Sequence, residues 1–151
     1  MREGRTSPEV VIGTLFFFGY PVPTLLDPRA THSFISYRLA ALAPIPASPL
    51  PEMWRVYYPF GDVEQVGWVY LNCEIFVESF ALTTNLMLLD IMDFDVILGM
   101  DFLEDHQAIF VCYSKEVLFR SPGLPENIIL WRQGVSNALF RFGDKGGKND
   151  K

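Results

Sequence analysis

Runs of apolar residues, separated by turn residues, divide the chain into many short segments. Segment 10–18 is rich in Val, Ile and Phe, residue types that favour β structure. The sequence Gly19-Tyr20-Pro21 predicts a turn, and segment 22–26 predicts a second strand. The pattern therefore predicts a hairpin that leads directly into Asp27.

Similar apolar segments recur along the rest of the chain and predict further strands. They are residues 54–58, 63–76, 81–89, 94–98, 109–112, 117–120 and 128–131. Hairpin tips are expected at 59–62, near 78–79 and around 114–115. Many short strands with turn signals between them predict an all-β barrel or sandwich.

Two short helices are predicted among these strands. Segment 33–42 has an apolar face, with Ser33 as its N-cap and His32 just before it. Four prolines then make 43–51 an irregular connector. Asp101 is expected to cap a brief helix that runs through His106.

The length and composition predict one packed domain with polar ends. The chain has 151 residues, of which 50% are hydrophobic and 15% aromatic. Residues 1–8 are polar and are predicted to be a flexible N-terminal tail. Residues 132–151 are predicted to be a C-terminal extension that is largely disordered at its Gly- and charge-rich end.

Charge and candidate metal ligands narrow the possible partners. The formal net charge is -6 and there is no basic patch, which disfavours nucleic-acid binding. Cys73 and Cys112 are isolated, and His32 and His106 are not at metal-ligand spacing. We therefore predict no metal, no cofactor and no disulfide scaffold, in an intracellular and cytoplasmic setting.

A membrane partner is also not expected. Segment 10–18 follows Arg2 and Arg5, as the core of a signal peptide would. However, Glu3 lies among these charges and no small-residue cleavage site follows, which favours a buried strand. No run of apolar residues approaches the ~18 that a membrane span needs.

Asp27 is the candidate for acid–base chemistry. It ends a predicted buried strand and opens the turn that continues with Pro28, Arg29, Ala30 and Thr31. Hydrolysis by paired carboxylates needs one protonated and one ionised acid that share a water molecule. Because the chain has one such turn, a working pair requires a homodimer. Taken alone, an Asp before Pro is more often a turn initiator.

Two further segments accompany Asp27. Ile97, Leu98 and Gly99 form a buried strand end whose glycine permits close passage behind another loop. Asp95 and Asp101 on either side are interpreted as turn and cap residues.

The predicted hairpin tip contains Pro59, Phe60, Gly61 and Asp62, with aromatic residues beside it. Such a tip is either a mobile flap that closes over a substrate or an ordinary surface hairpin.

The order of these motifs is more specific than any one of them. Gly13-Thr14-Leu15 is followed by the runs 26–36, 59–62 and 93–103, the last ending in Gly99-Met100-Asp101-Phe102-Leu103. This order resembles the retropepsin-like aspartic protease domain of plant gypsy-type LTR retrotransposon polyproteins. The resemblance covers roughly residues 9–131, which we take as the domain.

The resemblance implies a fold and a role for each motif. The fold would be a closed, mostly antiparallel β-barrel with one or two short helices, homodimeric when active. Asp27 would be the catalytic residue, Pro59 to Asp62 the flap, and Ile97 to Gly99 the support of the catalytic loop. The substrate would be the element's own polyprotein.

Two residues depart from the family's typical turn, which is Asp-Ser-Gly or Asp-Thr-Gly, with Asp-Pro-Gly in some plant elements. Pro28 has no hydroxyl group with which to join the two loops of a dimer. Arg29 replaces a conformationally free glycine, and its cation favours an ionised carboxylate, as in an Asp27–Arg29 ion pair.

Three hypotheses about function stay open at this point. The first is a homodimeric aspartic endopeptidase, in which one Asp27 is the general base and its mate the general acid. The second is a catalytically inactive, co-opted domain that serves as a binding or scaffold module. The third is a ligand-binding barrel unrelated to proteases.

Overall fold

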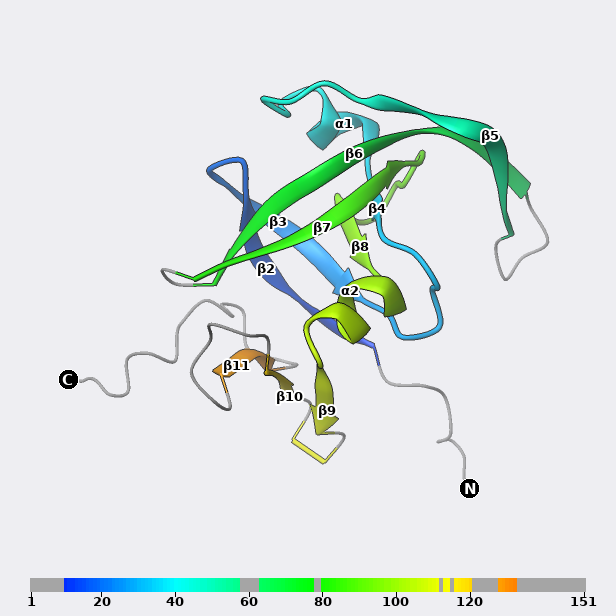
Figure 1. Ribbon diagram of the computed structural model, residues 1–151. Coiled ribbons are helices and arrows are strands. Elements are labelled where there is room, and N and C mark those ends of the chain that lie inside the picture. The colour runs from blue at the N-terminus through cyan, green and yellow to red at the C-terminus, as the bar shows by residue number, and fades with distance from the viewer. Residues whose placement is uncertain are drawn as a thin grey trace.

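The computed structural model describes residues 10–57, 63–77, 80–111, 113–114, 116–120 and 128–132 (Figure 1). The elements in chain order are β2 (Val11–Phe17), β3 (Tyr20–Leu26), β4 (Phe34–Ile35), α1 (Tyr37–Ala40), β5 (Ser48–Tyr57), β6 (Val63–Val77), β7 (Phe80–Leu88), β8 (Val96–Leu98), α2 (Met100–Asp105), β9 (Ile109–Val111), β10 (Glu116–Phe119) and β11 (Ile128–Arg132).

The main sheet closes on itself. Its seven strands follow the order β2-β3-β8-β4-β7-β6-β5, and β2 pairs in addition with β6. Most neighbours are antiparallel, but β3–β8 and β4–β7 are parallel. A separate sheet of three strands, β9 to β11, lies below the ring in Figure 1. The predicted mostly-β fold with two short helices is confirmed.

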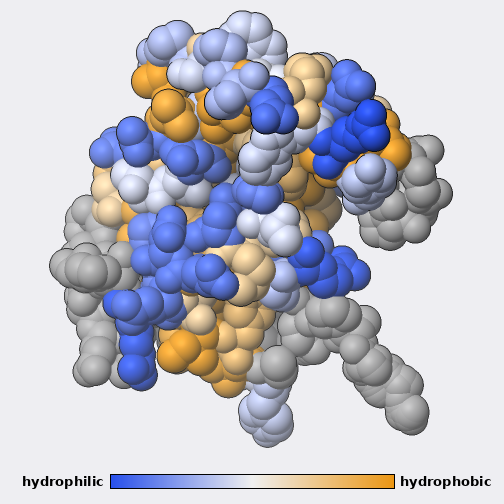
Figure 2. Space-filling view, turned by 45° about the vertical axis from the view of Figure 1, so that its right-hand side comes forward, coloured by the Kyte–Doolittle hydropathy of each residue, from blue (hydrophilic) through white to orange (hydrophobic). Residues whose placement is uncertain are grey.

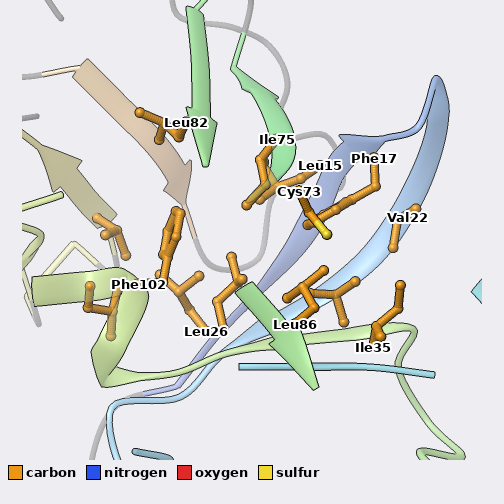
Figure 3. Close-up of a cluster of buried hydrophobic side chains, with 14 of the residues drawn as sticks. Leu15, Phe17, Val22, Leu26, Ile35, Cys73, Ile75, Leu82, Leu86 and Phe102 are labelled. Atoms are coloured by element: carbon orange, nitrogen blue, oxygen red, sulfur yellow. The ribbon is translucent and has the colours of Figure 1, made fainter. Parts of the chain in front are cut away.

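The core fills the interior of this ring. Along β2, Val11, Leu15 and Phe17 are buried and alternate with more exposed residues, as expected for a strand with one face inward. Figure 3 shows Leu15 and Phe17 converging with side chains from the other strands, and Phe102 of α2 lies in the same cluster. Burial of each such side chain contributes roughly 1.5–3 kcal/mol.

The β2–β3 hairpin turns one residue earlier than predicted. Phe18 and Gly19 both have positive φ, 55° and 86°, which is the requirement of a two-residue type I′ turn. Tyr20 and Pro21 therefore lie in β3, where they pair with residues of β2. Gly-Tyr-Pro is a sequence that favours a turn, but the pairing of β2 with β3 places Tyr20 and Pro21 in the strand.

The prediction that Ser33 caps the first helix is wrong. The helix begins at Tyr37, and the Oγ of Ser36 accepts a hydrogen bond from the N–H of Leu39 at 3.1 Å. Phe34 and Ile35 are instead β4, because pairing with β7 and β8 buries both of them. His32 accordingly lies in a loop and does not start a helix.

The proline-rich connector also differs from the prediction. β5 begins at Ser48 and includes Pro49 and Pro51. β5 is the last strand of the sheet and pairs only with β6, so one of its edges needs no N–H donors. The register shifts between Pro49 and Trp54, where the prolines interrupt regular pairing.

The remaining predictions agree with the structure except for one cap. The other predicted strands are present, with ends displaced by one or two residues. α2 is present, but its N-cap is Gly99, and Asp101 lies in the first turn of the helix. The expected tips at 59–62 and 78–79, residues 1–8 and 133–151 of the predicted tails and Cys112 lie outside the described residues, whereas Arg132 ends β11.

The described part of the chain contains no helix that is both long and apolar enough to cross a membrane.

The end of β8 passes directly behind the loop that follows Asp27. A Cβ atom on Gly99 would lie less than 3.0 Å from the carbonyl oxygens of His32 and Ala30. The next residue is joined to the same loop, since the N–H of Met100 donates to the carbonyl of Ala30 at 2.8 Å. Only a glycine fits between these two pieces of backbone.

Gly99→Ala should therefore lower the free energy of unfolding by about 3 kcal/mol or more, because two backbone segments have to move apart. Gly67→Ala is the matched control. A Cβ there would meet the Sδ of Met53 at 2.7 Å, the end of a flexible side chain that can move away. We expect that control to cost about 1 kcal/mol or less in urea unfolding. Equal losses for the two variants would contradict this account of β8.

Cys73 predicts a specific response to alkaline pH. It lies in the core as a free thiol, and burial raises its pKa to about 11. An unfolded thiol ionises near pH 8.5. Between these values the unfolded state loses the proton while the folded state keeps it, so stability falls as pH rises and then levels off above the folded pKa.

We expect wild type to lose on the order of 2 kcal/mol more than Cys73→Ala between pH 8 and pH 11, measured by urea unfolding at each pH. Other ionising groups are common to both proteins and cancel in the difference. Parallel pH profiles would show that the thiol stays accessible to solvent.

Candidate functional site

Asp27 is held by the backbone at the point where β3 ends. Its N–H donates to the carbonyl of Leu98 at 2.9 Å, which continues the parallel pairing of β3 with β8. Its own carbonyl accepts from the N–H of Ala30 at 3.1 Å, which closes the turn. The side chain is only 14% exposed, so the carboxylate is fixed by the strand behind it and largely withdrawn from solvent.

Arg29 engages both oxygens of this carboxylate. Its Nε donates to Oδ1 of Asp27 at 3.0 Å and its Nη2 donates to Oδ2 at 3.2 Å. The backbone N–H of Arg29 also donates to Oδ1, at 2.9 Å, in the manner of an Asx turn. The hydrogen bond to Asp27, followed by its negative charge, raises the pKa of the Arg29 guanidinium. The ion pair considered from the sequence is thus present.

The backbone of this turn does not require a glycine at position 29. Among the described residues, the non-glycine residues with positive φ are Phe18, Asn72 and Gln107, and Arg29 is not one of them. Arg29 therefore occupies this turn without the left-handed backbone that favours a glycine. What Arg29 changes is the space and the charge in front of Asp27.

A polar cluster beneath the turn fixes the loop to α2. The Oγ of Ser33 donates to Oδ1 of Asp101 at 2.7 Å and accepts from the N–H of Gly99 at 2.9 Å. The same carboxylate oxygen accepts from the N–H of Phe102 at 2.7 Å. Ser33 is fully buried, so each of these bonds replaces a contact with water that the fold excludes.

A pocket of about 490 Å³ opens in front of Asp27. The turn forms one wall and the strand β5, from Trp54 to Tyr57, forms the other. Figure 2 shows the surface hollowed below the β5 arm at the right of the view, with hydrophobic residues in the recess and hydrophilic ones on its margin. Apolar residues from three further strands or their ends complete the lining: Phe34, Met87, Leu89 and Ile97.

Contacts between aromatic residues join the two walls. The ring of His32 meets the ring of Trp54 edge-on, with 4.6 Å between centroids. The Nδ1 of His32 is also 2.9 Å from the Oγ1 of Thr31. The contact between His32 and Trp54 connects the loop of Asp27 with the β5–β6 hairpin.

The structure brings together only some of the residues singled out from the sequence. Asp27, Arg29, Ala30 and Thr31 line the pocket together with Ile97.

Three other predicted residues lie close to these but do not line the pocket. Pro28 is half-buried in the turn, Leu98 is fully buried behind Asp27, and Gly99 lies under the loop. The predicted flap residues Pro59, Phe60, Gly61 and Asp62 lie outside the described residues. The strands that lead to them pair up to Tyr57 and Val63.

Several pocket residues were not identified from the sequence. The sequence position of three of them could have pointed to the site: His32 follows the Asp27 turn, and Trp54 and Arg55 precede the predicted flap. Met87 and Leu89 carry no such signal, because only the pairing of β7 with β4 brings them to the site.

The charged groups define what the site can do chemically. Among the described residues that line the pocket, Asp27 is the one carboxylate, and Arg29 and Arg55 are the cations. Within the described residues there is also no group of three or more His, Cys, Asp or Glu suited to a metal ion. A carboxylate in this setting can accept a proton or orient water, provided that the guanidinium releases it.

Comparison with known proteins places this geometry in a family. The family model described as "Retroviral aspartyl protease" matches residues 1–123. No curated protein sequence matches the chain. The extent of the family match argues against a barrel unrelated to proteases.

Two solved structures show the same fold. The retroviral protease-like domain of Ddi1 from Leishmania major matches with a TM-score of 0.55 and 12% identity, over 82% of this chain and 96% of that one. EIAV protease in complex with the inhibitor HBY-793 matches with a TM-score of 0.51 and 18% identity, over 74% of this chain and 99% of that one. By its family match and its fold, the chain belongs to the retroviral aspartyl protease family.

Proposed function

We propose that this chain is a retropepsin-like domain that binds extended peptides in the Asp27 pocket without cleaving them, because Arg29 occupies the catalytic carboxylate. The observation that carries the proposal is the contact of Arg29 with both oxygens of Asp27, at 3.0 and 3.2 Å. It favours the inactive, co-opted binding module over an efficient endopeptidase.

The chemistry of aspartic proteases explains why this contact matters. Two Asp27 carboxylates from two subunits would have to share one proton and a water molecule. A guanidinium that binds both oxygens takes the positions at which a proton or water would bind. The residue that would do the chemistry is present, but its oxygens are not available.

Peptide binding is supported by the strand that forms the opposite wall. β5 is at the end of the sheet order and is paired on one side only. Its consecutive residues Trp54 to Tyr57 line the pocket, so the unpaired edge of the strand borders the space in front of Asp27. An extended peptide can add to such an edge through backbone hydrogen bonds, while apolar residues in the recess hold its side chains.

Replacing Arg29 should release the blocked activity. We expect Arg29→Gly to raise the cleavage of fluorescein-labelled casein at mildly acidic pH by about 100-fold over wild type, the scale of acid–base catalysis by one positioned group. The double variant Asp27→Asn with Arg29→Gly should return to the wild-type background. A wild-type protein that cleaves as fast as Arg29→Gly would contradict the block.

A second candidate function is a homodimeric endopeptidase that processes a retrotransposon polyprotein. The favouring observation is that the Arg29 side chain is 54% exposed. Exposed ion pairs contribute only about 0–1 kcal/mol, so a second subunit or a substrate can displace the guanidinium. The order of motifs shared with plant gypsy-type proteases supports the polyprotein as substrate, and an intracellular setting remains a prediction.

This second candidate makes a different prediction for the wild-type protein. Sedimentation equilibrium should show a dimer, and casein cleavage should be measurable with Arg29 in place and lost in Asp27→Asn. A wild-type monomer, or cleavage that survives Asp27→Asn, would exclude this candidate, because one carboxylate cannot form the pair.

A further inference from the structure

Arg55 gives the pocket a positive charge that no other described residue of its lining neutralises. Among the described residues, those with charge in the lining are Asp27, Arg29 and Arg55, so the Asp27–Arg29 pair leaves one cation in excess. This local excess occurs in a chain whose formal net charge is -6. The pocket is therefore electrostatically unlike the protein as a whole.

The position of Arg55 leaves its guanidinium available to a ligand. It is an exposed residue on the arm of β5, and across the sheet its pairing partner is the uncharged Gln65. Within the described residues it has no ion pair, whereas Arg38 is held by Asp95 at 2.8 Å. Arg29 adds to the attraction for an anionic ligand, because its guanidinium has N–H donors that do not bond to Asp27.

We propose that Arg55 makes the pocket selective for peptides that carry a carboxylate group. A guanidinium binds a carboxylate through two parallel hydrogen bonds, and this geometry is stronger and more specific than contact with a neutral amide. The carboxylate comes either from an Asp or Glu side chain or from the C-terminus of the peptide. This inference rests on the proposed peptide-binding function and adds to it the chemical class of the ligand.

The rest of the pocket limits where the carboxylate sits. Apolar residues line both walls. Phe34, Met87, Leu89 and Ile97 lie away from β5, and Trp54, Val56 and Tyr57 lie on β5 beside Arg55. An apolar surface of this kind favours hydrophobic side chains. The ligand that fits both walls thus has a carboxylate facing β5 and apolar residues around it.

Fluorescence polarisation with three labelled peptides tests the selectivity. All three alternate Val and Thr. The first has a central Glu and an amidated C-terminus, the second has Gln in its place, and the third has Gln and a free C-terminal carboxylate. We expect at least one carboxylate peptide to bind about tenfold more tightly than the Gln amide, the scale of one charge-assisted hydrogen bond. Which of the two binds identifies the source of the carboxylate.

Substitutions of Arg55 test whether this residue causes the preference for carboxylate peptides. In Arg55→Gln the preference should disappear, and in Arg55→Lys part of it should remain. Arg120→Gln is the matched control, because it removes the same charge from an exposed position that does not line the pocket. It should keep the full preference.

The outcomes separate this inference from the function on which it rests. Equal binding of all three peptides, or a preference that survives in Arg55→Gln, would overturn the role of Arg55 and leave peptide binding intact. If none of the three peptides binds, both the role of Arg55 and the proposed peptide-binding function are overturned.

Discussion

The close passage of Gly99 behind the loop from Ala30 to His32 is the constraint on which the site depends. Because no side chain separates the two backbones, β8 can hold the loop by direct contact and by the hydrogen bond from Met100 to Ala30. The neighbouring carbonyl of Leu98 then sets the position of Asp27. The site is thus built on a rigid strand, as precise chemistry requires.

The support of Asp27 and the occupation of its carboxylate are separate features of the structure. Ser33 and Asp101 hold the loop from below, and neither contacts Arg29 in the described interactions. Arg29 acts from above, within the same turn as Asp27. A fold that positions a carboxylate and a residue that withdraws it can therefore coexist, which is why family membership alone does not establish activity.

The sequence predicted the strands well because their apolar runs and turn residues are local signals. It failed where distant strands decided the outcome. Phe34 and Ile35 lie in a helix-like pattern, but pairing with β7 and β8 makes them a strand. Pro49 was predicted to interrupt regular structure, but it is tolerated in β5 because β5 is the edge strand of the sheet.

In the candidate site, too, the local features were predictable and those that depend on distant strands were not. Asp27, Arg29 and their ion pair were predictable because they are two residues apart and chemically complementary. The place of Arg55 in the pocket lining was not predicted, because its position just before the predicted flap is a weak signal until the β5–β6 hairpin lies over the turn.

The ion pair between Asp27 and Arg29 is contained in one short turn, and this has a consequence for inheritance. No other described element has to change if position 29 changes, because the backbone there has no positive φ and the support of Asp27 comes from below. A single base change converts an arginine codon into a glycine codon. The arginine form of this turn, with its ion pair, and the glycine form are therefore neighbours in the genetic code, and a lineage can pass between them without rebuilding the fold.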